Sequence, residues 1–146
     1  VTRTFSKIHG LAGLRVGYSV CSSKIAEILN RVRQPFNVNA LGTVAALAAL
    51  EDEGFVVESR RLNREQMSRI CKDLDRLGLN WIPSVGNFVS VDVGRPAAPV
   101  FHRMLQSGVI VRLIENYGMP NHLRITVGLE DENARALRAL ESALVE

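Results

Sequence analysis

The sequence of 146 residues is poor in the side chains on which several classes of protein depend. Its only two cysteines, Cys21 and Cys71, lie fifty residues apart and form no Cys-x-x-Cys pair. This spacing favours reduced, structural thiols over a disulfide framework. The three histidines are equally scattered, without the spacing of metal ligands, so we expect no metal site.

Long apolar runs are also missing. No stretch approaches the roughly 20 apolar residues that a membrane-spanning helix needs, and no signal-peptide pattern opens the chain. The hydrophobic fraction of 47% and the charged fraction of 23% are typical of a globular protein. We therefore expect a cytoplasmic protein without a membrane partner.

Lysine is scarce, and the formal charge of +3 rests on arginine. The arginine clusters, Arg31 with Arg33 and Arg60 with Arg61, have no interleaved aromatic residues, and acids such as Glu58 dilute them. We expect no nucleic-acid partner from this pattern. A modest basic bias suits small anionic molecules better.

The glycines at positions 10, 13 and 17 do not follow the G-x-G-x-x-G spacing of a dinucleotide-binding loop. Gly10 and Gly13 lie in the turn between two stretches, residues 1–6 and 14–20, that are predicted to be short buried strands. The remaining periodicity predicts further helices and strands and an α/β fold. Helices are expected from Ser22 or Ser23 to Pro35, over 40–50 with Asn39 as cap, over about 55–77 with Gly78 as stop, over 97–107 and over 130–145. Strands are expected over 87–93, 109–113 and 123–127.

Lys7 follows the first predicted strand, and Arg15 lies eight residues later, beyond the glycine turn. A lysine amine in a partly desolvated pocket can attack an aldehyde to form a Schiff base, and an arginine can grip a phosphate with its planar fork. Thr4 and Ser6 share one face of the extended chain and add hydroxyl groups. Together these side chains indicate a pocket for pyridoxal 5′-phosphate (PLP), whereas on spacing alone a surface lysine is the commoner explanation.

The string S-K-I-H-G-L-A-G-L-R-V-G-Y at residues 6–18 resembles the lysine motif of fold-type-I PLP-dependent aminotransferases, above all the histidinol-phosphate aminotransferases. Further family motifs follow in order at residues 33–39, 84–88, 108–112 and 116–128. The resemblance implies the end of a large PLP-binding domain over residues 1–52 and a smaller C-terminal α/β domain over 53–146, with a long linking helix at about 55–77. Because members of the family carry a long upstream segment, we expect the C-terminal part of a longer enzyme that is inactive alone.

The resemblance also implies roles for the residues near the lysine. Lys7 is expected to be the catalytic residue, bonded to PLP and moving a proton during the reaction. Arg15 is expected to bind the cofactor phosphate, with support from Ser6 and Thr4. Without the resemblance, Arg15 is a surface cation and the two hydroxyls are ordinary strand residues.

A second set of residues is expected to bind the substrate. The alternation over residues 123–127 places Leu123 and Ile125 on one face of a strand and Arg124 on the other. An arginine there is either solvated or, as the resemblance implies, bound to the anionic end of the substrate. By the same resemblance, Arg112 is a second anion contact and Asn87 lines the pocket, although Asn87 also suits a turn.

The activity that the resemblance implies is exchange of the amine of histidinol phosphate with 2-oxoglutarate, which becomes glutamate, in histidine biosynthesis. A homodimer is expected from the same source. An aromatic amino acid aminotransferase and a phosphothreonine decarboxylase of the same fold are alternatives. A non-catalytic aminotransferase-like module is the alternative from another class.

Overall fold

The computed structural model describes residues 1–145 and divides into two compact units, Val1–Arg60 and Arg61–Glu146. The division falls inside the long helix α3 (Glu53–Arg76), which matches the helix expected at about 55–77. Helices and sheet occur in both units, which confirms the predicted α/β fold class. The domain limits expected from the resemblance, 1–52 and 53–146, stay a prediction.

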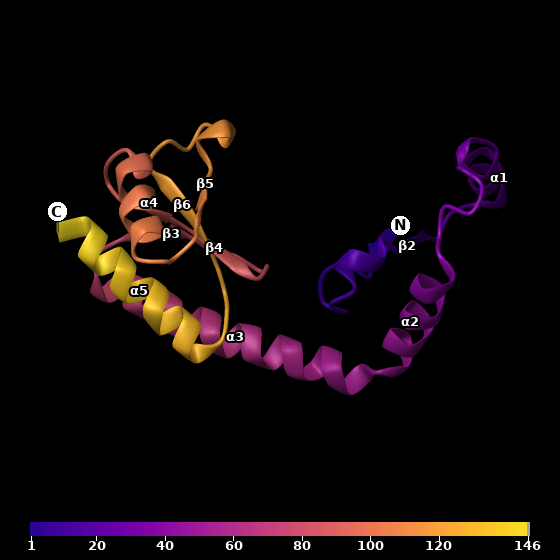
Figure 1. The fold of residues 1–146 in the computed structure, drawn as a ribbon, viewed down its shortest axis with the longest axis horizontal. Coiled ribbons are helices and arrows are strands. Elements are labelled where there is room, and N and C mark those ends of the chain that lie inside the picture. The colour runs from indigo at the N-terminus through magenta and orange to yellow at the C-terminus, as the bar shows by residue number, and fades with distance from the viewer. Residues whose placement is uncertain (146) are drawn as a thin grey trace. The chain divides into compact units, whose positions relative to one another are not determined.

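The first unit begins with a two-stranded antiparallel ribbon, in which Arg3 lies opposite Tyr18. Its elements are β1 (Thr2–Thr4), the 3₁₀ helix η1 (Ala12–Leu14), β2 (Gly17–Ser19), α1 (Ser23–Val32), α2 (Ala40–Glu51) and the start of α3. Figure 1 shows these elements in indigo to magenta. The turn that contains Lys7 joins the two strands of the ribbon.

A small core of Phe5, Val16 and Ala46 holds the ribbon to α2. The backbone N–H of Phe5 donates to the carbonyl of Val16 at 3.1 Å. Helix α2 approaches closely because Gly42 has no side chain, since a Cβ there would lie 2.6 Å from Val16 Cγ2. Asn39 caps α2 as predicted, its Oδ1 accepting from the Gly42 N–H at 2.7 Å.

One expectation about this unit is wrong. The strands predicted to be buried are exposed along β1 and β2, because the helices of this unit leave the ribbon uncovered and only the flanking Phe5 and Val16 are buried. Helix α1 forms where its periodic apolar stripe predicts it, yet none of its residues is buried. Ser22 stands at its N-cap position, but its side chain accepts no capping hydrogen bond.

The second unit is a four-stranded sheet with helices on one face. Its elements after α3 are β3 (Asn80–Ile82), β4 (Phe88–Asp92), α4 (Ala97–Gln106), β5 (Arg112–Leu113), the 3₁₀ helix η2 (Glu115–Tyr117), β6 (His122–Thr126) and α5 (Glu130–Val145). The strand order is β3-β4-β6-β5, and every neighbouring pair is antiparallel. Strand β3 was not predicted, and β5 is shorter than the strand expected over 109–113.

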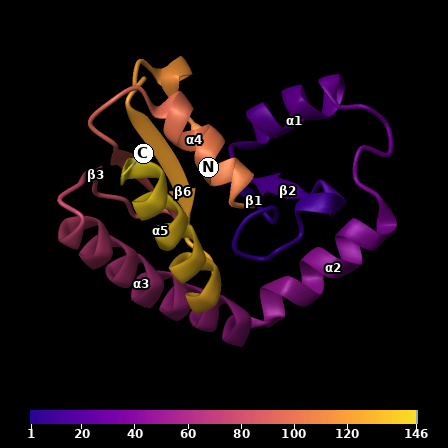
Figure 2. The ribbon, with the colours of Figure 1, turned by 60° about the vertical axis from the view of Figure 1, so that its left-hand side comes forward.

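Alternation along the strands gives the sheet one buried face and one open face. Residues Val89, Val91, Leu123 and Ile125 are buried and form one core with residues of α3, α4 and α5. Figures 1 and 2 show α4 and α5 against the strands. The other face carries Phe88, Ser90, Arg112 and Arg124, and no helix of residues 61–145 covers it.

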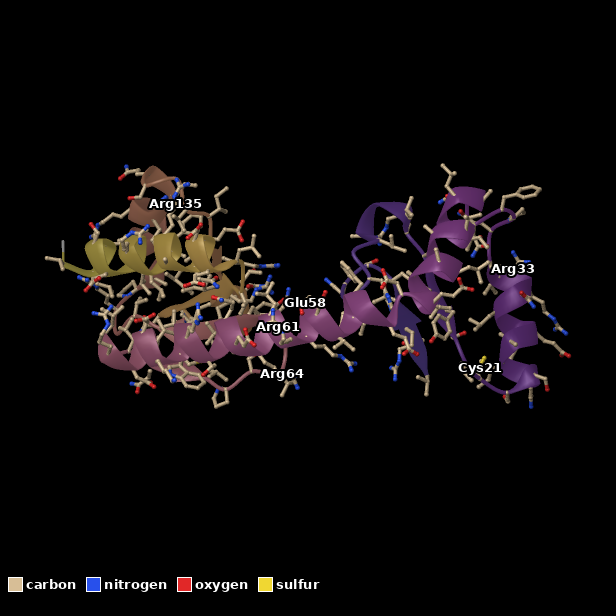
Figure 3. All side chains as sticks on the ribbon, turned by 90° about the horizontal axis from the view of Figure 1, so that it is seen from below. Cys21, Arg33, Glu58, Arg61, Arg64 and Arg135 are labelled. Carbon is tan, nitrogen blue, oxygen red and sulfur yellow. The ribbon has the colours of Figure 1, made fainter. Side chains whose placement is uncertain are left out.

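Helix ends in this unit are fixed by a glycine and an arginine. Gly78 has a φ of 70° and ends α3 as predicted, with the Leu79 N–H donating to the carbonyl of Leu74 at 3.0 Å. Arg135 of α5 reaches the end of α4, where its Nη2 lies 3.4 Å from the carbonyl oxygens of Ser107 and Gly108 (Figure 3). Within residues 1–145, no helix is both long enough and apolar enough to cross a membrane.

Candidate functional site

Lys7 lies in the turn that follows β1, with its side chain exposed. Its carbonyl accepts from the Gly10 N–H at 2.9 Å, and the Leu11 N–H donates to the Phe5 carbonyl at 3.0 Å. Because Phe5 is buried, these bonds anchor the turn on the small core of the unit. The fold thus holds the backbone of Lys7 in place and leaves its amine accessible.

Arg15 folds back toward the same turn. Its Nη1 donates to the carbonyl of Ala12 at 2.8 Å and lies 3.5 Å from the hydroxyl oxygen of Ser6. The Ser6 N–H donates in turn to Thr4 Oγ1 at 3.1 Å. The structure therefore brings together three of the predicted cofactor residues, Thr4, Ser6 and Arg15, beside Lys7 in the chain.

The backbone of Arg15 is strained. Its φ of 54° lies in the left-handed region, which a residue with a Cβ adopts at a cost of about 1 to 2 kcal/mol. Such conformations cluster at binding sites, where the surrounding structure holds them. Here the conformation follows η1 and directs the guanidinium toward Ser6.

The donor set of this turn fits PLP. A lysine amine suits the aldehyde, and a guanidinium with two hydroxyls suits the phosphate. His9 adds a buried Nδ1 that has no hydrogen-bond partner among the described residues, with its ring centroid 5.1 Å from that of Phe5. Hydrogen-bonding capacity is therefore unused next to the lysine.

Arg124 occupies the open face of the sheet in the second unit. It pairs across β6 with Ser90 of β4 on one side and with Arg112 of β5 on the other. Its guanidinium carbon lies 4.8 Å from the centroid of the Phe88 ring, a cation–π contact. Like charges directly opposite each other destabilise a sheet, so the pair Arg112 and Arg124 suits an anion bound between or beside them.

The Nε atom of Arg124 is shielded from solvent and has no hydrogen-bond partner among residues 1–145. A buried polar donor without a partner costs free energy, on the order of 1 to 3 kcal/mol. A carboxylate or phosphate oxygen would satisfy it. Arg124 is thus the predicted substrate residue for which the structure offers the most specific support.

Asn87 is exposed immediately before β4, and its backbone carbonyl accepts from the Val127 N–H at 2.8 Å. Beside it, an open hollow of about 410 Å³ lies along β3, the following loop and β4. The hollow is lined by Ile82, Pro83, Ser84, Val85, Gly86, Phe88 and Ser90.

Sequence reasoning missed Phe88 and Ser90. The alternation over residues 88–92 contains the signal, because Val89 and Val91 mark the buried face and place Phe88 and Ser90 on the other. The predicted cofactor residues lie in the first unit and Asn87, Arg112 and Arg124 in the second, where Arg112 and Arg124 are cross-strand neighbours. Among the described residues, no three His, Cys, Asp or Glu side chains are grouped so as to hold a metal ion.

The fold and the sequence motifs together define the protein family. The chain belongs to the aminotransferase class I and II family, whose sequence pattern matches residues 1–140. Within that family, it is 59% identical over 144 residues to histidinol-phosphate aminotransferase 2 of Pseudomonas fluorescens Pf-5, an alignment that covers 99% of this chain and 39% of the relative. The resemblance stated from the sequence motifs is confirmed.

Solved structures show the same fold. The histidinol-phosphate aminotransferase of Sinorhizobium meliloti, crystallised with pyridoxal-5′-phosphate, matches with a TM-score of 0.90 and 30% identity, over 99% of this chain and 40% of that one. An L-threonine-O-3-phosphate decarboxylase of Porphyromonas gingivalis matches with a TM-score of 0.85 and 25% identity, over 99% of this chain and 46% of that one. The chain thus spans less than half the length of these proteins.

Proposed function

We propose that this chain is part of a PLP-dependent aminotransferase that acts on histidinol phosphate in histidine biosynthesis. The amino group passes from the substrate carbon to the carbonyl carbon of 2-oxoglutarate, and the carbonyl oxygen passes the other way, so that glutamate forms. The observation that carries the proposal is the 59% identity, over 99% of the chain, to a relative named histidinol-phosphate aminotransferase.

In this proposal, Arg15, Ser6 and Thr4 hold the cofactor phosphate, and Lys7 holds the aldehyde end. When bound, PLP supplies an electron sink for the carbon that loses its proton. The Lys7 amine takes that proton as a general base, which requires the neutral form of Nζ. The contact of Arg15 Nη1 with Ser6 Oγ supports the phosphate part of this assignment.

Arg124 binds the anionic end of the substrate, with Arg112 as a second contact and Asn87 at the edge of the site. An arginine fork can hold either a phosphate or a carboxylate through two parallel hydrogen bonds. One residue therefore serves histidinol phosphate in one half-reaction and 2-oxoglutarate in the other. The unpartnered Nε of Arg124 supports this role.

The test is steady-state kinetics of the full-length protein that contains this chain. We expect turnover of histidinol phosphate with 2-oxoglutarate, and a much lower kcat/KM with phenylalanine as amino donor. A preference for phenylalanine would make the protein an aromatic amino acid aminotransferase. Absence of turnover with every donor would favour a non-catalytic module. The 146-residue chain by itself is expected to be inactive.

Decarboxylation of threonine phosphate is the second candidate, because a decarboxylase with that substrate shares the fold. The same assay distinguishes it, since release of carbon dioxide from O-phosphothreonine, without a keto product, would replace transamination. We further propose a homodimer in the cytoplasm. Sedimentation of the full-length protein tests the dimer, and a monomer at assay concentration would contradict it.

A further inference from the structure

Two polar side chains are buried within residues 1–145, and they bind each other. Gln66 of α3 is 4% exposed and Asn133 of α5 is 5% exposed. Asn133 Nδ2 donates to Gln66 Oε1 at 3.0 Å. Burying an amide is costly unless its hydrogen bonds are satisfied, so such a pair tends to fix one specific arrangement.

The side-chain amide of Asn133 also makes two hydrogen bonds with the backbone of Gly128, which lies between β6 and α5. Its Nδ2 donates to the Gly128 carbonyl at 2.9 Å, and its Oδ1 accepts from the Gly128 N–H at 2.8 Å. A Cβ at Gly128 would lie 2.5 Å from Glu132 Oε2 and 3.2 Å from Glu132 Cβ, so a side chain there would require Glu132 to move. The chain leaving β6 is therefore clamped at one residue.

Helix α3, which carries Gln66, also binds the chain that enters β4. Asn63, one turn before Gln66 on α3, donates from Nδ2 to the Gly86 carbonyl at 3.0 Å. The two chain segments are joined directly, since the Val127 N–H donates to the Asn87 carbonyl at 2.8 Å. Hydrogen bonds thus link α3 to the segment before β4, that segment to the end of β6, the residue after β6 to α5, and α5 back to α3. We call these four links the hydrogen-bond circuit.

This circuit borders the anion site on the open face of the sheet. Phe88 is the first residue of β4 and pairs with Thr126 at the end of β6. The Phe88 ring lies under the guanidinium of Arg124, which is two residues before Thr126 on the same strand. A shift at either strand end moves the ring relative to the guanidinium.

We propose that Gln66 and Asn133 are positioning residues for Arg124. They touch neither substrate nor cofactor, and they act by fixing the two strand ends that set the contact between Phe88 and Arg124. A displaced guanidinium loses part of its hydrogen bonding to the substrate anion, which weakens binding in the ground state and the transition state alike. This inference rests on the proposed function, in which Arg124 binds the substrate anion.

The test uses the full-length holoenzyme with Gln66→Leu and Asn133→Asp. Leucine removes the acceptor of Gln66, and aspartate keeps the acceptor for the Gly128 N–H but loses the donor to Gln66 and to the Gly128 carbonyl. Gln106→Leu, on the exposed surface of α4, is the matched control. KM and kcat for histidinol phosphate are measured, together with kcat/KM for histidinol, which lacks the phosphate, and the dissociation constant of inorganic phosphate by calorimetry.

We expect the KM for histidinol phosphate and the dissociation constant of phosphate to rise about tenfold in both variants, because hydrogen bonding to the anion is weakened. We expect kcat, and kcat/KM for histidinol, to stay within about twofold of the parent. Equal losses with histidinol and histidinol phosphate, or parental values in a folded Gln66→Leu protein, would overturn the positioning role. If Asn133→Asp does not fold, the kinetics of Gln66→Leu alone test the positioning role. A parent enzyme without transaminase activity would instead refute the proposed function, and the phosphate titration would still report on Arg124.

Discussion

The guanidinium of Arg15 lies 3.5 Å from the hydroxyl of Ser6, measured from Nη1 to Oγ. The two residues are nine positions apart, and the turn at η1 with the left-handed backbone of Arg15 brings them together. We expect this strained residue, which faces a hydroxyl next to the candidate lysine, to be a phosphate ligand. The cofactor assignment can therefore be tested at this contact.

Arg15→Lys should weaken PLP binding by the full-length protein about tenfold to a hundredfold. Lysine keeps the positive charge but loses the planar fork, and a hydrogen bond to a charged group contributes about 1.5 to 3 kcal/mol. A spectroscopic titration gives the dissociation constant. Arg3→Lys, on the exposed strand β1, is the matched control and should bind PLP like the parent. Equal affinities in both variants would remove Arg15 from the site.

Arg124→Gln should raise the KM for histidinol phosphate and for 2-oxoglutarate alike, by about tenfold or more. Both substrates present an anion, and the fork that would hold it is lost. Arg138→Gln, exposed on α5, is the control and should leave both values unchanged. A change in KM for only one of the two substrates would contradict a shared anion contact at Arg124.

Helix positions follow from the sequence because caps and periodicity are local properties. Asn39 and Gly78 mark helix ends that the structure confirms. Strand β3 has only three residues and too little alternation to be recognised. The burial of β1 and β2 was wrongly predicted, because apolar residues show a tendency to be covered but do not show what covers them.

The candidate site could be predicted in part. Motif resemblance selects Lys7, Arg15 and Arg124, but their contacts depend on the fold. The stacking of Phe88 on Arg124 requires the register of β4 against β6, which no local pattern sets. The buried pair of Gln66 and Asn133 lies 67 residues apart in the chain and has no periodic signature in the sequence.

Leu140→Ala should lower the free energy of unfolding of the second unit by about 2 to 5 kcal/mol. The Leu140 side chain is fully buried in the core between helices and sheet, so its removal leaves a cavity. Leu105→Ala is the control, because Leu105 is 42% exposed and its loss should cost less than about 1 kcal/mol. Urea unfolding measures both, and similar losses would contradict the assigned core.

Cys71 should react slowly with a thiol reagent at pH 8 and faster as the pH rises. Burial, and then the neighbouring Asp75 carboxylate, raise the pKa of the Cys71 thiol above its ordinary value of 9.0. Only the thiolate reacts, so a raised pKa lowers the rate. The measurement uses Cys21→Ser, which leaves Cys71 as the only thiol in the chain. Asp75→Asn should increase the rate, and an unchanged rate would exclude the carboxylate as a cause.

The same shift of the Cys71 pKa has a defined sign for stability. Above pH 9.0 the unfolded chain loses this proton while the folded chain keeps it, so the folded state binds more protons. The contribution of Cys71 to the free energy of unfolding is therefore full below pH 9.0 and falls as the pH rises toward the folded pKa. Urea unfolding is measured at several pH values above 9.0 for the parent and for Cys71→Ser. The free energy of unfolding should fall less with rising pH in Cys71→Ser than in the parent. An equal or larger fall in Cys71→Ser would contradict the sign.

The most direct test of the account is to locate the lysine that bonds to the cofactor. The full-length protein is loaded with PLP, reduced with borohydride to fix the bond, digested and analysed by mass spectrometry. We predict that the pyridoxyl group is found on the peptide that contains Lys7 and that Lys7→Ala abolishes it. A pyridoxyl group on Lys24 or Lys72, or on no peptide of this chain, would contradict the assignment of Lys7 as the catalytic residue.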